Sequence, residues 1–361
     1  MSTILEYVWL DGYKPEPNLR SKIRVEDRVS NNPPWWSFDG SSTQQALGGN
    51  SDCILEPVRV YNNPFFEDAS IVLCEVKDSN GDPHESNVRA TMEEHETWWF
   101  GFEQEYVLEK NGRPLGFPKH GFPAPQGEFY CGVGPQNVQG REIADKHLTM
   151  CIEAGINISG TNAEVMVGQW EYQCFAEGAK RSADDAWISR YIMHRLVEKY
   201  NVVFNLHPKP IKGDWNGTGM HTNFSNTEMR DVGGKGLFVD LCKKLEMKHD
   251  EHIAVYGADN DQRLTGLHET QHISKFSYGE SDRGASVRIP LAVVESNWQG
   301  YLEDRRPSGN ADPYQVVKRI IDTFRKFCNR FLIWIIWCRR RIFNDSFFNF
   351  YGDTSSFRSS E

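Results

Sequence analysis

A ten-residue segment at positions 100–109, FGFEQEYVLE, places Glu103 and Glu105 two residues apart in a run of mostly apolar residues. Because alternate residues of a β-strand point to the same face, this pattern predicts a strand with two different faces. Tyr106 and Leu108 are expected to enter a core, whereas Glu103 and Glu105 share the opposite face. Two negative charges side by side on so apolar a strand require either exposure to solvent or a bound cation.

The size and charge of the chain narrow the range of partners. The 361 residues are enough for one large domain or two domains of ordinary size. The formal net charge of −10 argues against a nucleic-acid partner, because binding a phosphate backbone requires a basic face. Clustered arginines could still hold small anionic ligands.

The cysteines and the N-terminus both indicate a cytoplasmic protein. The eight cysteines include no CxxC pair and no zinc-type spacing, so we expect reduced, mostly buried thiols. The first residues lack the basic region and apolar run of a signal peptide. The longest wholly apolar run, residues 331–338, is far shorter than the ~20 residues needed to span a bilayer, so no membrane association is expected.

The composition predicts two domains. About the first eighty residues are β-rich, with strands expected at ILEYVWLDG and ASIVLCEVKD, and we assign the linker to residues 79–86. The N-terminal domain is placed at residues 1–82 and a larger domain at 83–361. Helix and strand signals are interspersed in the larger domain, which predicts an α+β fold with a mainly antiparallel sheet.

Hydrophobic period and capping residues predict the elements of the larger domain. Helices are expected from Ser86, over residues 141–154, 182–200 and 236–248, and after Asp312-Pro313, a strong N-cap and first-turn pair. Strands are expected at INISG, NAEVMVGQWEYQ, VVFNLHPKP, MHTNF and SVRIPL.

A second pair of acids, Glu164 and Glu171, lies seven residues apart within NAEVMVGQWEYQ. An odd separation places two residues on opposite faces of a regular strand. These carboxylates therefore converge only if the strand bulges or turns between them, and Gly168 lies where a bulge could form.

Three further charged residues lie in or beside apolar, strand-like segments. Glu303 and Arg305 lie at strand spacing in YLEDRRP, and His221 stands beside the short apolar part of HTNF. Taken singly, each signal has a plain structural explanation, such as a solvated strand face, a satisfied histidine or an exposed ion pair worth ~0–1 kcal/mol. Taken together, the five glutamates would repel one another when clustered, and Mg²⁺ or Mn²⁺ at ~2.1 Å from their oxygens would neutralise them.

Four arginines fall in one third of the chain, next to turns rich in glycine and serine: Arg263, Arg283, Arg288 and Arg305. Arginines close to carboxylate-bound metals are typical of phosphoryl transfer, in which catalysis is mostly positioning and charge stabilisation. The sequence contains no GxxxxGK[ST] loop. If ATP is used, metals and arginines therefore hold its phosphates.

Seven ordered motifs resemble glutamine synthetase of the compact type usual in eukaryotes and some bacteria. They are FDGSST, FGFEQEY, NAEVMVGQWEYQ, DWNGTGMHTNF, RLTGLHET, VRIP and YLEDRRPSGNADPY, and the resemblance runs from about Tyr7 to Asp322. It implies an N-terminal β-grasp domain, a larger α+β catalytic domain with a curved sheet, and a decamer of two stacked pentameric rings. Each active site would then lie between the N-terminal domain of one subunit and the C-terminal domain of its neighbour.

The resemblance also implies roles for individual residues. One metal would be bound by Glu105, Glu164 and Glu171, and another by Glu103, His221 and Glu303. Phosphate-holding positions match Arg283, Arg288 and Arg305, and glutamate-binding positions match Asn216, Gly217, His221 and Arg263. The ammonium pocket matches Ser42, Tyr130 and Asp39 of the adjacent subunit, and the closing flap matches Glu269. Nucleotide-binding positions match Trp99, Asn223, Ser225, Arg230 and Tyr301, with Arg288 beside the ATP phosphates.

The implied reaction is an ATP-dependent ligation of L-glutamate and ammonia. The side-chain carboxylate of glutamate attacks the γ-phosphate of ATP, giving γ-glutamyl phosphate and ADP, and ammonia then displaces phosphate to give L-glutamine. Ammonium is not nucleophilic, so a carboxylate has to take its proton, and Asp39 is assigned that role. A flap at Glu269 would keep water away from the acyl phosphate.

Several positions depart from the family pattern. Val167 stands where proline is usual, Phe175-Ala176 replaces Gly-Pro near the nucleotide site, and Glu128-Phe129 replaces Pro-Tyr. From about residue 323 the resemblance stops, and the aromatic, basic tail is atypical. Three alternatives stay open: a γ-glutamyl ligase for another amine, a non-catalytic structural oligomer related to the synthetase, and a metallohydrolase, which would not explain the arginines.

Overall fold

The computed structural model describes residues 2–27, 32–124 and 128–325. Up to Thr323 the chain forms one compact unit. The atypical tail predicted from about residue 323 lies almost entirely outside the described residues. Within the part that the structure describes, no helix combines the length and the apolar composition needed to cross a membrane. The six cysteines of this part are free thiols, and Cys131 alone among them is exposed.

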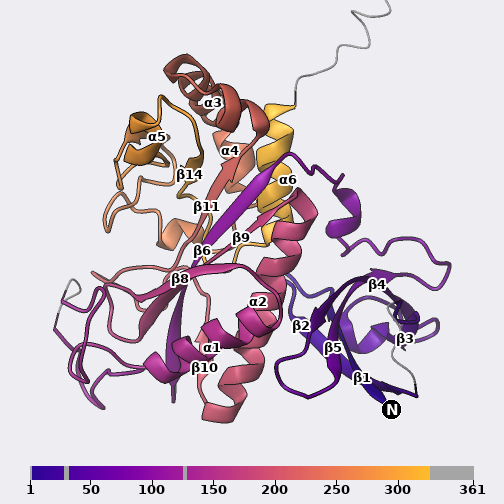
Figure 1. Ribbon diagram of the computed structural model, residues 1–361. Helices are drawn as coiled ribbons and strands as arrows, with labels where there is room; N and C mark the ends of the chain where they lie inside the picture. Colours follow the sequence, from indigo (N-terminus) through magenta and orange to yellow (C-terminus); the bar gives the residue numbers. More distant parts are fainter. Residues whose placement is uncertain (1, 28–31, 125–127, 326–361) are drawn as a thin grey trace, which may run out of the picture. The chain divides into compact units, whose positions relative to one another are not determined.

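The N-terminal part is a five-stranded sheet (Figure 1). Its strands are β1 (Thr3–Leu10), β2 (Leu19–Glu26), β3 (Trp36–Asp39), β4 (Asp52–Asn62) and β5 (Ala69–Lys77), in the order β2-β1-β5-β4-β3. β1 and β5 run parallel, and the other pairs are antiparallel. Tyr7, Leu55 and Val72 lie fully buried in its core. The short 3-10 helix η1 (Gly40–Thr43) follows β3.

The larger part is built on a nine-stranded sheet with β6 near its middle. Its strands are β6 (Trp99–Lys110), β7 (Arg113–Pro114), β8 (Ile158–Ala163), β9 (Gln169–Glu177), β10 (Val203–Asn205), β11 (Met220–Ser225), β12 (Tyr278–Glu280), β13 (Val287–Ile289) and β14 (Leu302–Asp304). The main path is β12-β13-β14-β11-β6-β9-β8, and β7 and β10 also pair with β6. All pairs are antiparallel except β12 with β13. The predicted fold class, a β-rich N-terminal part followed by a larger α+β part, is confirmed.

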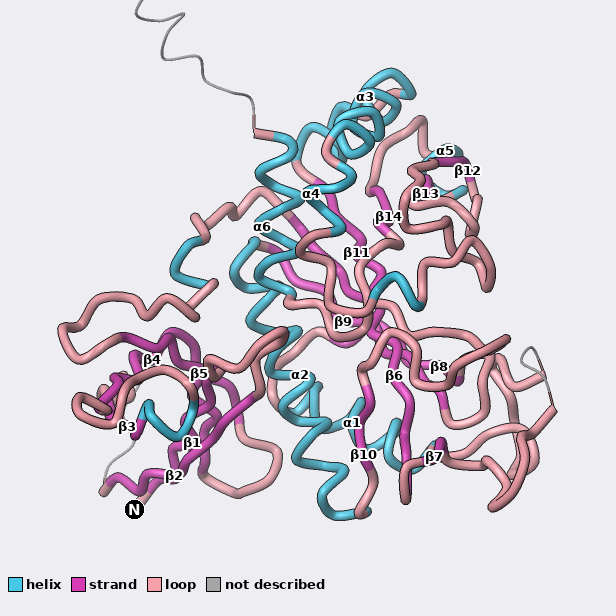
Figure 2. Tube along the Cα trace, turned by 180° about the vertical axis from the view of Figure 1, so that it is seen from behind, coloured by secondary structure: helices cyan, strands magenta, loops and turns pink. Residues whose placement is uncertain are grey.

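Helices pack against this sheet and against one another. They are α1 (Arg141–Glu153), α2 (Ala179–Tyr200), α3 (Lys235–Met247), α4 (His249–Ile253), α5 (Leu291–Glu295) and α6 (Pro313–Phe324), with short turns η2 (Arg89–Thr91), η3 (Glu228–Val232) and η4 (Asn260–Gln262). The long helix α2 contacts β6, β9, β10 and α1, and Figure 2 shows α1 and α2 side by side. The predictions of α1, α2, α3 and α6 are confirmed to within about three residues. At α6, Tyr314 N donates to Asp312 Oδ1 at 2.9 Å, as expected of an N-cap.

The helix predicted from Ser86 is wrong. That segment forms only the 3-10 turn η2, because its side chains are bonded to other elements. Asn87 Nδ2 donates to Val76 O at 3.1 Å. Arg89 Nε donates to Asp184 Oδ1 at 2.7 Å, which links the segment to α2. These tertiary bonds outweigh a local helix preference that is worth only tenths of a kcal/mol per residue.

Candidate active site

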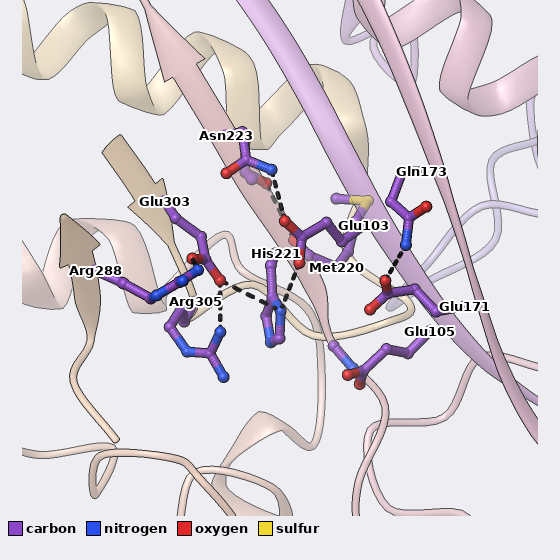
Figure 3. A network of polar contacts seen from close by, with 12 residues as sticks. Glu103, Glu105, Glu171, Gln173, Met220, His221, Asn223, Arg288, Glu303 and Arg305 are labelled. Carbon is purple, nitrogen blue, oxygen red and sulfur yellow. Dashed lines mark hydrogen bonds and ion pairs between the residues drawn. The ribbon is translucent and has the colours of Figure 1, made fainter. Parts of the chain in front are cut away.

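Strand pairing places Glu103 and Glu105 of β6 opposite other candidate ligands. In the antiparallel pairing of β6 with β11, Glu103 lies opposite His221. In the pairing of β6 with β9, Glu105 lies opposite Glu171. Directly opposed residues of neighbouring strands point to the same side of a sheet. The four side chains therefore gather over the middle of the larger sheet (Figure 3).

β14 adds Glu303 to this group. His221 Nδ1 lies 3.3 Å from Glu103 Oε2 and 3.7 Å from Glu303 Oε1, so the imidazole stands between two carboxylates. Arg288 Nη1 donates to Glu303 Oε2 at 2.6 Å, and Arg305 Nη1 donates to Glu303 Oε1 at 2.5 Å (Figure 3). Two arginines thus compensate the charge of a carboxylate that is almost fully buried.

Glu164 reaches the group through a turn rather than a bulge. The stretch predicted as one strand is divided between β8 and β9, and Glu164 N donates to Gln169 O at 3.0 Å across the reversal. Gly168 has φ +80°, and a Cβ there would lie 2.5 Å from Leu115 O, so the position requires glycine. After burial and the charges of Glu103 and Glu105, the charge of Glu164 also raises the pKa of Glu171, so the turn brings these two carboxyl groups close together.

These side chains line a cavity of about 570 Å³. The residues assigned from the sequence that line it are Glu103, Glu105, Tyr130, Glu164, Glu171, Asn216, Gly217, His221, Arg263, Glu269, Arg283 and Arg305. Four lining residues were not predicted: Val165, Lys209, His268 and Thr270. For Lys209 the only available signal was a charged residue between two prolines in the otherwise largely apolar segment VVFNLHPKP.

Burial and repulsion by neighbouring carboxylates oppose ionisation of Glu164 and Glu171. Burial and the neighbouring carboxylates raise the pKa of Glu171 well above its usual range. Burial and the charge of Glu105 raise the pKa of Glu164 to about 8. Burial, followed by the charge of Arg305, lowers the pKa of His221 to about 3, so its imidazole is neutral and can act as a ligand.

Two groups of side chains have the spacing and chemistry of divalent-cation ligands. Glu103, His221 and Glu303 form one group, and Glu105, Glu171 and His221 form the other, with ligand atoms within 4.8 Å of one another in each. The first group is the set assigned from the sequence, whereas the second contains His221 in place of Glu164. A hard divalent cation fits both groups, because it would relieve the repulsion among these clustered carboxylates.

The two arginines that bind Glu303 also carry donors without a partner in the described part of the chain. Nε of Arg288 and Nε of Arg305 are buried and have no hydrogen-bond partner among the described residues. Their Nη1 atoms already bind Glu303. An unpaired buried donor is costly, so these atoms point to a ligand with several acceptor oxygens, such as a phosphate group.

A loop packs against Arg263 at another part of the cavity. Arg263 is 5% exposed, and its Nη2 donates to Arg305 O at 3.1 Å and lies 3.1 Å from His221 Nε2. Burial lowers the pKa of Arg263 to about 10. A Cβ on Gly217 would lie 2.4 Å from Pro208 O and 2.9 Å from Arg263 Cγ, so only glycine allows this close approach.

The residues assigned to the nucleotide lie beside Glu103 rather than in the main cavity. Asn223 Nδ2 donates to Glu103 Oε1 at 2.8 Å. Arg230 Nη1 donates to Ser225 Oγ at 3.0 Å, and its guanidinium carbon lies 3.7 Å from the centre of the Trp99 ring. This group offers an aromatic face and hydrogen-bond donors next to the carboxylates.

Two further residues belong to this neighbourhood. Tyr301 is 40% exposed, and the charges of Glu103 and Glu303 contribute to raising its pKa, after burial. Phe175, which departs from the family pattern, stands edge-on to Trp99 with ring centres 5.9 Å apart.

The N-terminal residues assigned to the ammonium pocket do not line this cavity within one chain. Asp39 is exposed at the end of β3, and its carboxylate accepts from Ser41 N at 3.0 Å and from Ser42 Oγ at 2.7 Å. The hydrogen bonds from Ser41 and Ser42 lower the pKa of Asp39, so this carboxylate is ionised at neutral pH.

The segment that carries Glu269 has an unusual backbone. His268 and Glu269 have φ +54° and +56°, a left-handed backbone conformation that residues other than glycine rarely adopt. The Glu269 side chain is 67% exposed, and its Oε2 lies 4.0 Å from Arg305 Nη2. Backbone strain of this kind concentrates at functional sites.

Two family models match the chain. One, described as the β-grasp domain of glutamine synthetase, matches residues 1–79, and one described as the catalytic domain of glutamine synthetase matches residues 85–251. Curated relatives extend the similarity. The chain is 52% identical over 327 residues to the glutamine synthetase of Bradyrhizobium diazoefficiens, covering 88% of this chain and 95% of that protein.

Eukaryotic relatives are almost as similar. The chain is 49% identical over 333 residues to the glutamine synthetase of Emericella nidulans, covering 89% of this chain and 92% of that protein. It is 47% identical over 343 residues to a chloroplastic glutamine synthetase of Chlamydomonas reinhardtii, covering 89% of this chain and 90% of that protein.

Proposed function

The chain belongs to the glutamine synthetase family, and we propose that it forms L-glutamine from L-glutamate and ammonia in an ATP-dependent ligation. The observation that carries this function is the meeting of carboxylates from β6 and β9 with Arg263 and Arg305 in one cavity, where Arg305 is paired with Glu303 of β14. Acidic side chains would hold divalent cations there, and the arginines would hold anionic substrates.

The first step is transfer of the γ-phosphate of ATP to the side-chain carboxylate of glutamate. A carboxylate oxygen attacks phosphorus, the bond to ADP breaks, and γ-glutamyl phosphate forms. Arg288 and Arg305 supply donors to the phosphate oxygens, consistent with their unused Nε atoms, and Arg283 at the cavity wall stabilises the same charge.

We assign the cofactor cations as Mg²⁺ or Mn²⁺, which the two carboxylate groups would hold. Glu103, His221 and Glu303 would hold one ion, and Glu105, Glu164 and Glu171 would hold the other. Cations held there would neutralise the carboxylates and polarise the phosphate oxygens. The protein keeps these ligands in place through strand pairing, so little rearrangement is needed when the ions bind.

Glutamate is bound at the end of the cavity where Arg263, Asn216 and Gly217 lie. ATP is held by the group of Trp99, Asn223, Ser225, Arg230 and Tyr301, with its base against the Trp99 ring. In this proposal the phosphates of ATP would lie near Glu103, between the base and the amino-acid substrate.

The second step uses ammonia. Asp39 accepts a proton from ammonium, and the resulting ammonia attacks the carbonyl carbon of γ-glutamyl phosphate. The bond from that carbon to the phosphate oxygen breaks, and the departing phosphate takes up the second proton that nitrogen loses. Ser42 and Tyr130 complete the ammonium pocket, and Glu269 closes over the site so that water does not hydrolyse the acyl phosphate. Since Asp39 lies outside the cavity of its own chain, we assign it to the site of a neighbouring subunit in a decamer of two pentameric rings.

The alternatives considered from the sequence are not favoured by the relatives, which are glutamine synthetases. We assign the activity to the cytoplasm. The test uses glutamate labelled with ¹⁸O in its side-chain carboxylate, incubated with ATP, Mg²⁺ and ammonium. The account expects one ¹⁸O atom in the phosphate released per glutamine formed. Phosphate without label would exclude γ-glutamyl phosphate as the intermediate.

A further inference from the structure

Gln104 lies between Glu103 and Glu105 on β6, but its side chain lies on the other face of the sheet. Alternate residues of a strand point to opposite faces, so Gln104 is turned away from the two glutamates. There it meets helix α2, because Arg190 Nε donates to Gln104 Oε1 at 2.8 Å. Both side chains are almost fully buried. The back of β6 is therefore a buried contact with α2 that the proposed reaction has not used.

Arg190 contacts three segments of the larger sheet. The first is β6, which it reaches through Gln104. The second is β11, where Arg190 Nη2 lies 3.0 Å from Sδ of Met220, the residue that precedes His221. The third is the segment that follows β14, where the same Nη2 atom donates to Gly309 O at 3.0 Å. One guanidinium thus connects β6 and β11 with the end of β14.

These three segments are also bonded to one another around the guanidinium. Gln104 Nε2 donates to Glu105 O at 2.9 Å and to Gly309 O at 3.0 Å. Gly309 N donates to Thr218 O at 2.9 Å, in the stretch that leads into β11. A Cβ on Gly309 would lie 2.6 Å from Thr218 Oγ1, so the segments approach one another closely. Arg190 completes a continuous hydrogen-bond network behind the carboxylates.

The charge of Arg190 has no counter-ion at contact distance. Its polar contacts with the described residues are an amide oxygen, a thioether and a backbone carbonyl, and none is a carboxylate. Burial lowers the pKa of Arg190, and more distant acidic groups such as Asp312 and Glu16 oppose this only in part. A buried charge of this kind is costly. A neutral side chain of similar size would cost less if filling space were the only role.

The shape of the guanidinium accounts for an arginine at this position. It presents five donors in a rigid plane, whereas a lysine ammonium is a point charge without that fixed geometry. We propose that Arg190 is a positioning residue for the cation ligands, which holds β6, β11 and the segment after β14 in register. Held in this way, Glu105, His221 and Glu303 keep the mutual distances that a divalent cation requires. This inference rests on the cation sites of the proposed function.

The plainer alternative is that Arg190 only stabilises the packing of α2 on the sheet. That role predicts a less stable protein whose folded form still binds cations with wild-type affinity. The positioning role predicts weaker binding and a less uniform ligand geometry in the folded form itself. Cation affinity and the spectrum of the bound ion, measured on folded protein, therefore separate the two accounts.

The experiment uses the assembled full-length protein and Mn²⁺, with calorimetry for affinity and electron paramagnetic resonance for the geometry of the bound ion. Arg190→Met removes every donor, and Arg190→Lys keeps the charge but loses the planar set of donors. Arg195→Met is the matched control, because Arg195 lies on the same helix and its guanidinium binds the buried Glu6 of the N-terminal sheet instead. Unfolding in urea measures the stability of each variant.

We expect Arg190→Met to weaken Mn²⁺ binding about 10- to 100-fold, as for loss of a residue that orients metal ligands, and to broaden the resonance of the bound ion. Arg190→Lys should lose most of the affinity too. Arg195→Met should lower stability but keep the wild-type affinity and spectrum.

Three results would overturn the inference. The first is wild-type affinity and spectrum in folded Arg190→Met. The second is full recovery by Arg190→Lys, which would mean that charge matters and geometry does not. The third is an equal loss of affinity in Arg195→Met, which would mean that the effect follows stability alone.

A double variant covers the case in which Arg190→Met does not fold. Gln104→Met combined with Arg190→Met removes donor and acceptor together, so Gln104 Oε1 is not left buried and unpaired. We expect this protein to fold and still to bind Mn²⁺ weakly, and wild-type affinity would overturn the inference.

The wild-type protein keeps this test separate from the proposed function. If the wild-type protein binds no Mn²⁺, the cation sites of the proposed function are wrong. If the wild-type protein binds Mn²⁺ and Arg190→Met binds it equally well, only the role of Arg190 is wrong.

Discussion

Glu103 Oε2 lies 3.3 Å from Nδ1 of His221, directly across the pairing of β6 with β11. The neighbouring acid of β6, Glu105, is paired with Glu171 in the same way across β9. The register of three strands therefore fixes the distances among the ligand atoms, whereas loops would leave them free to vary. A site held in this way is preorganised for cations.

Replacing Glu105 by glutamine should weaken binding of divalent cations by at least about tenfold, because the change removes one anionic ligand from a buried group. Titration calorimetry with Mn²⁺ measures the effect. The control is Glu109→Gln on the same strand, where the carboxylate instead accepts from Asn205. Equal affinities of wild type and Glu105→Gln for Mn²⁺ would mean that Glu105 is not a cation ligand.

The pKa of Glu164 predicts a coupling between cation binding and protons. With a pKa raised to about 8, Glu164 is mostly protonated at pH 7 in the metal-free protein. A cation bound beside Glu105 favours the ionised form, so binding releases protons and becomes tighter as the pH rises toward 8. Calorimetry in buffers of different ionisation enthalpy measures the release. Binding without proton release at pH 7 would contradict the prediction, and Glu164→Gln should reduce the release.

The same shift predicts how the metal-free protein responds to pH. The folded state holds the Glu164 proton up to about pH 8, whereas the unfolded chain loses it near the ordinary value of 4.5. The contribution of Glu164 to the free energy of unfolding is therefore complete below pH 4.5 and is lost as the pH rises through 8. Thermal unfolding of wild type and Glu164→Gln between pH 5 and 8 should show a steeper decline for wild type. An equal decline of the unfolding temperature with pH in the two proteins would contradict the prediction.

Gly217→Ala should impair glutamate binding. The new Cβ would meet Pro208 O at 2.4 Å and Arg263 Cγ at 2.9 Å, so the loop or the guanidinium has to move. We expect the KM for glutamate to rise on the order of 10- to 100-fold while the affinity for ATP is retained. The control is Gly236→Ala in α3, where a Cβ meets nothing within 4 Å and should stabilise the helix by about 0.5–1 kcal/mol.

Subunit mixing tests whether Asp39 serves a neighbouring cavity. Asp39→Ala alone should cripple the use of ammonia but spare binding of ATP and glutamate. Glu303→Gln alone should be inactive because its own cavity is damaged. In mixed oligomers, the intact Asp39 of the Glu303→Gln chain can meet the intact cavity of the Asp39→Ala chain. Activity above that of both parents is expected, and co-assembled mixtures without such recovery would show that the site is not shared.

Local sequence patterns predicted the elements that carry the site. Alternation in FGFEQEYVLE identified β6, and Asp312-Pro313 identified the start of α6. The pattern failed at Ser86, because the bonds of Arg89 to Asp184 connect residues about a hundred positions apart. Helix propensity depends on neighbouring residues only, so it cannot predict a bond between residues this far apart in the sequence.

The meeting of Glu103 with Glu303 could not be derived from spacing either. It depends on the sheet order β14-β11-β6, which is set by long-range packing. The charge pattern suggested only that the five glutamates gather around metals, and the resemblance to a family assigned Glu103 and Glu303 to one ligand set. Lys209 was missed by both routes, because a lysine between prolines shows no period and belonged to none of the seven motifs.

The most direct test of the central claim is phosphate release from ATP by the purified chain with Mg²⁺ and L-glutamate, with and without ammonium, and identification of the product by mass. The account predicts ammonium-dependent phosphate release with one glutamine formed per phosphate. A folded oligomer that binds ATP but forms no glutamine under these conditions would contradict it.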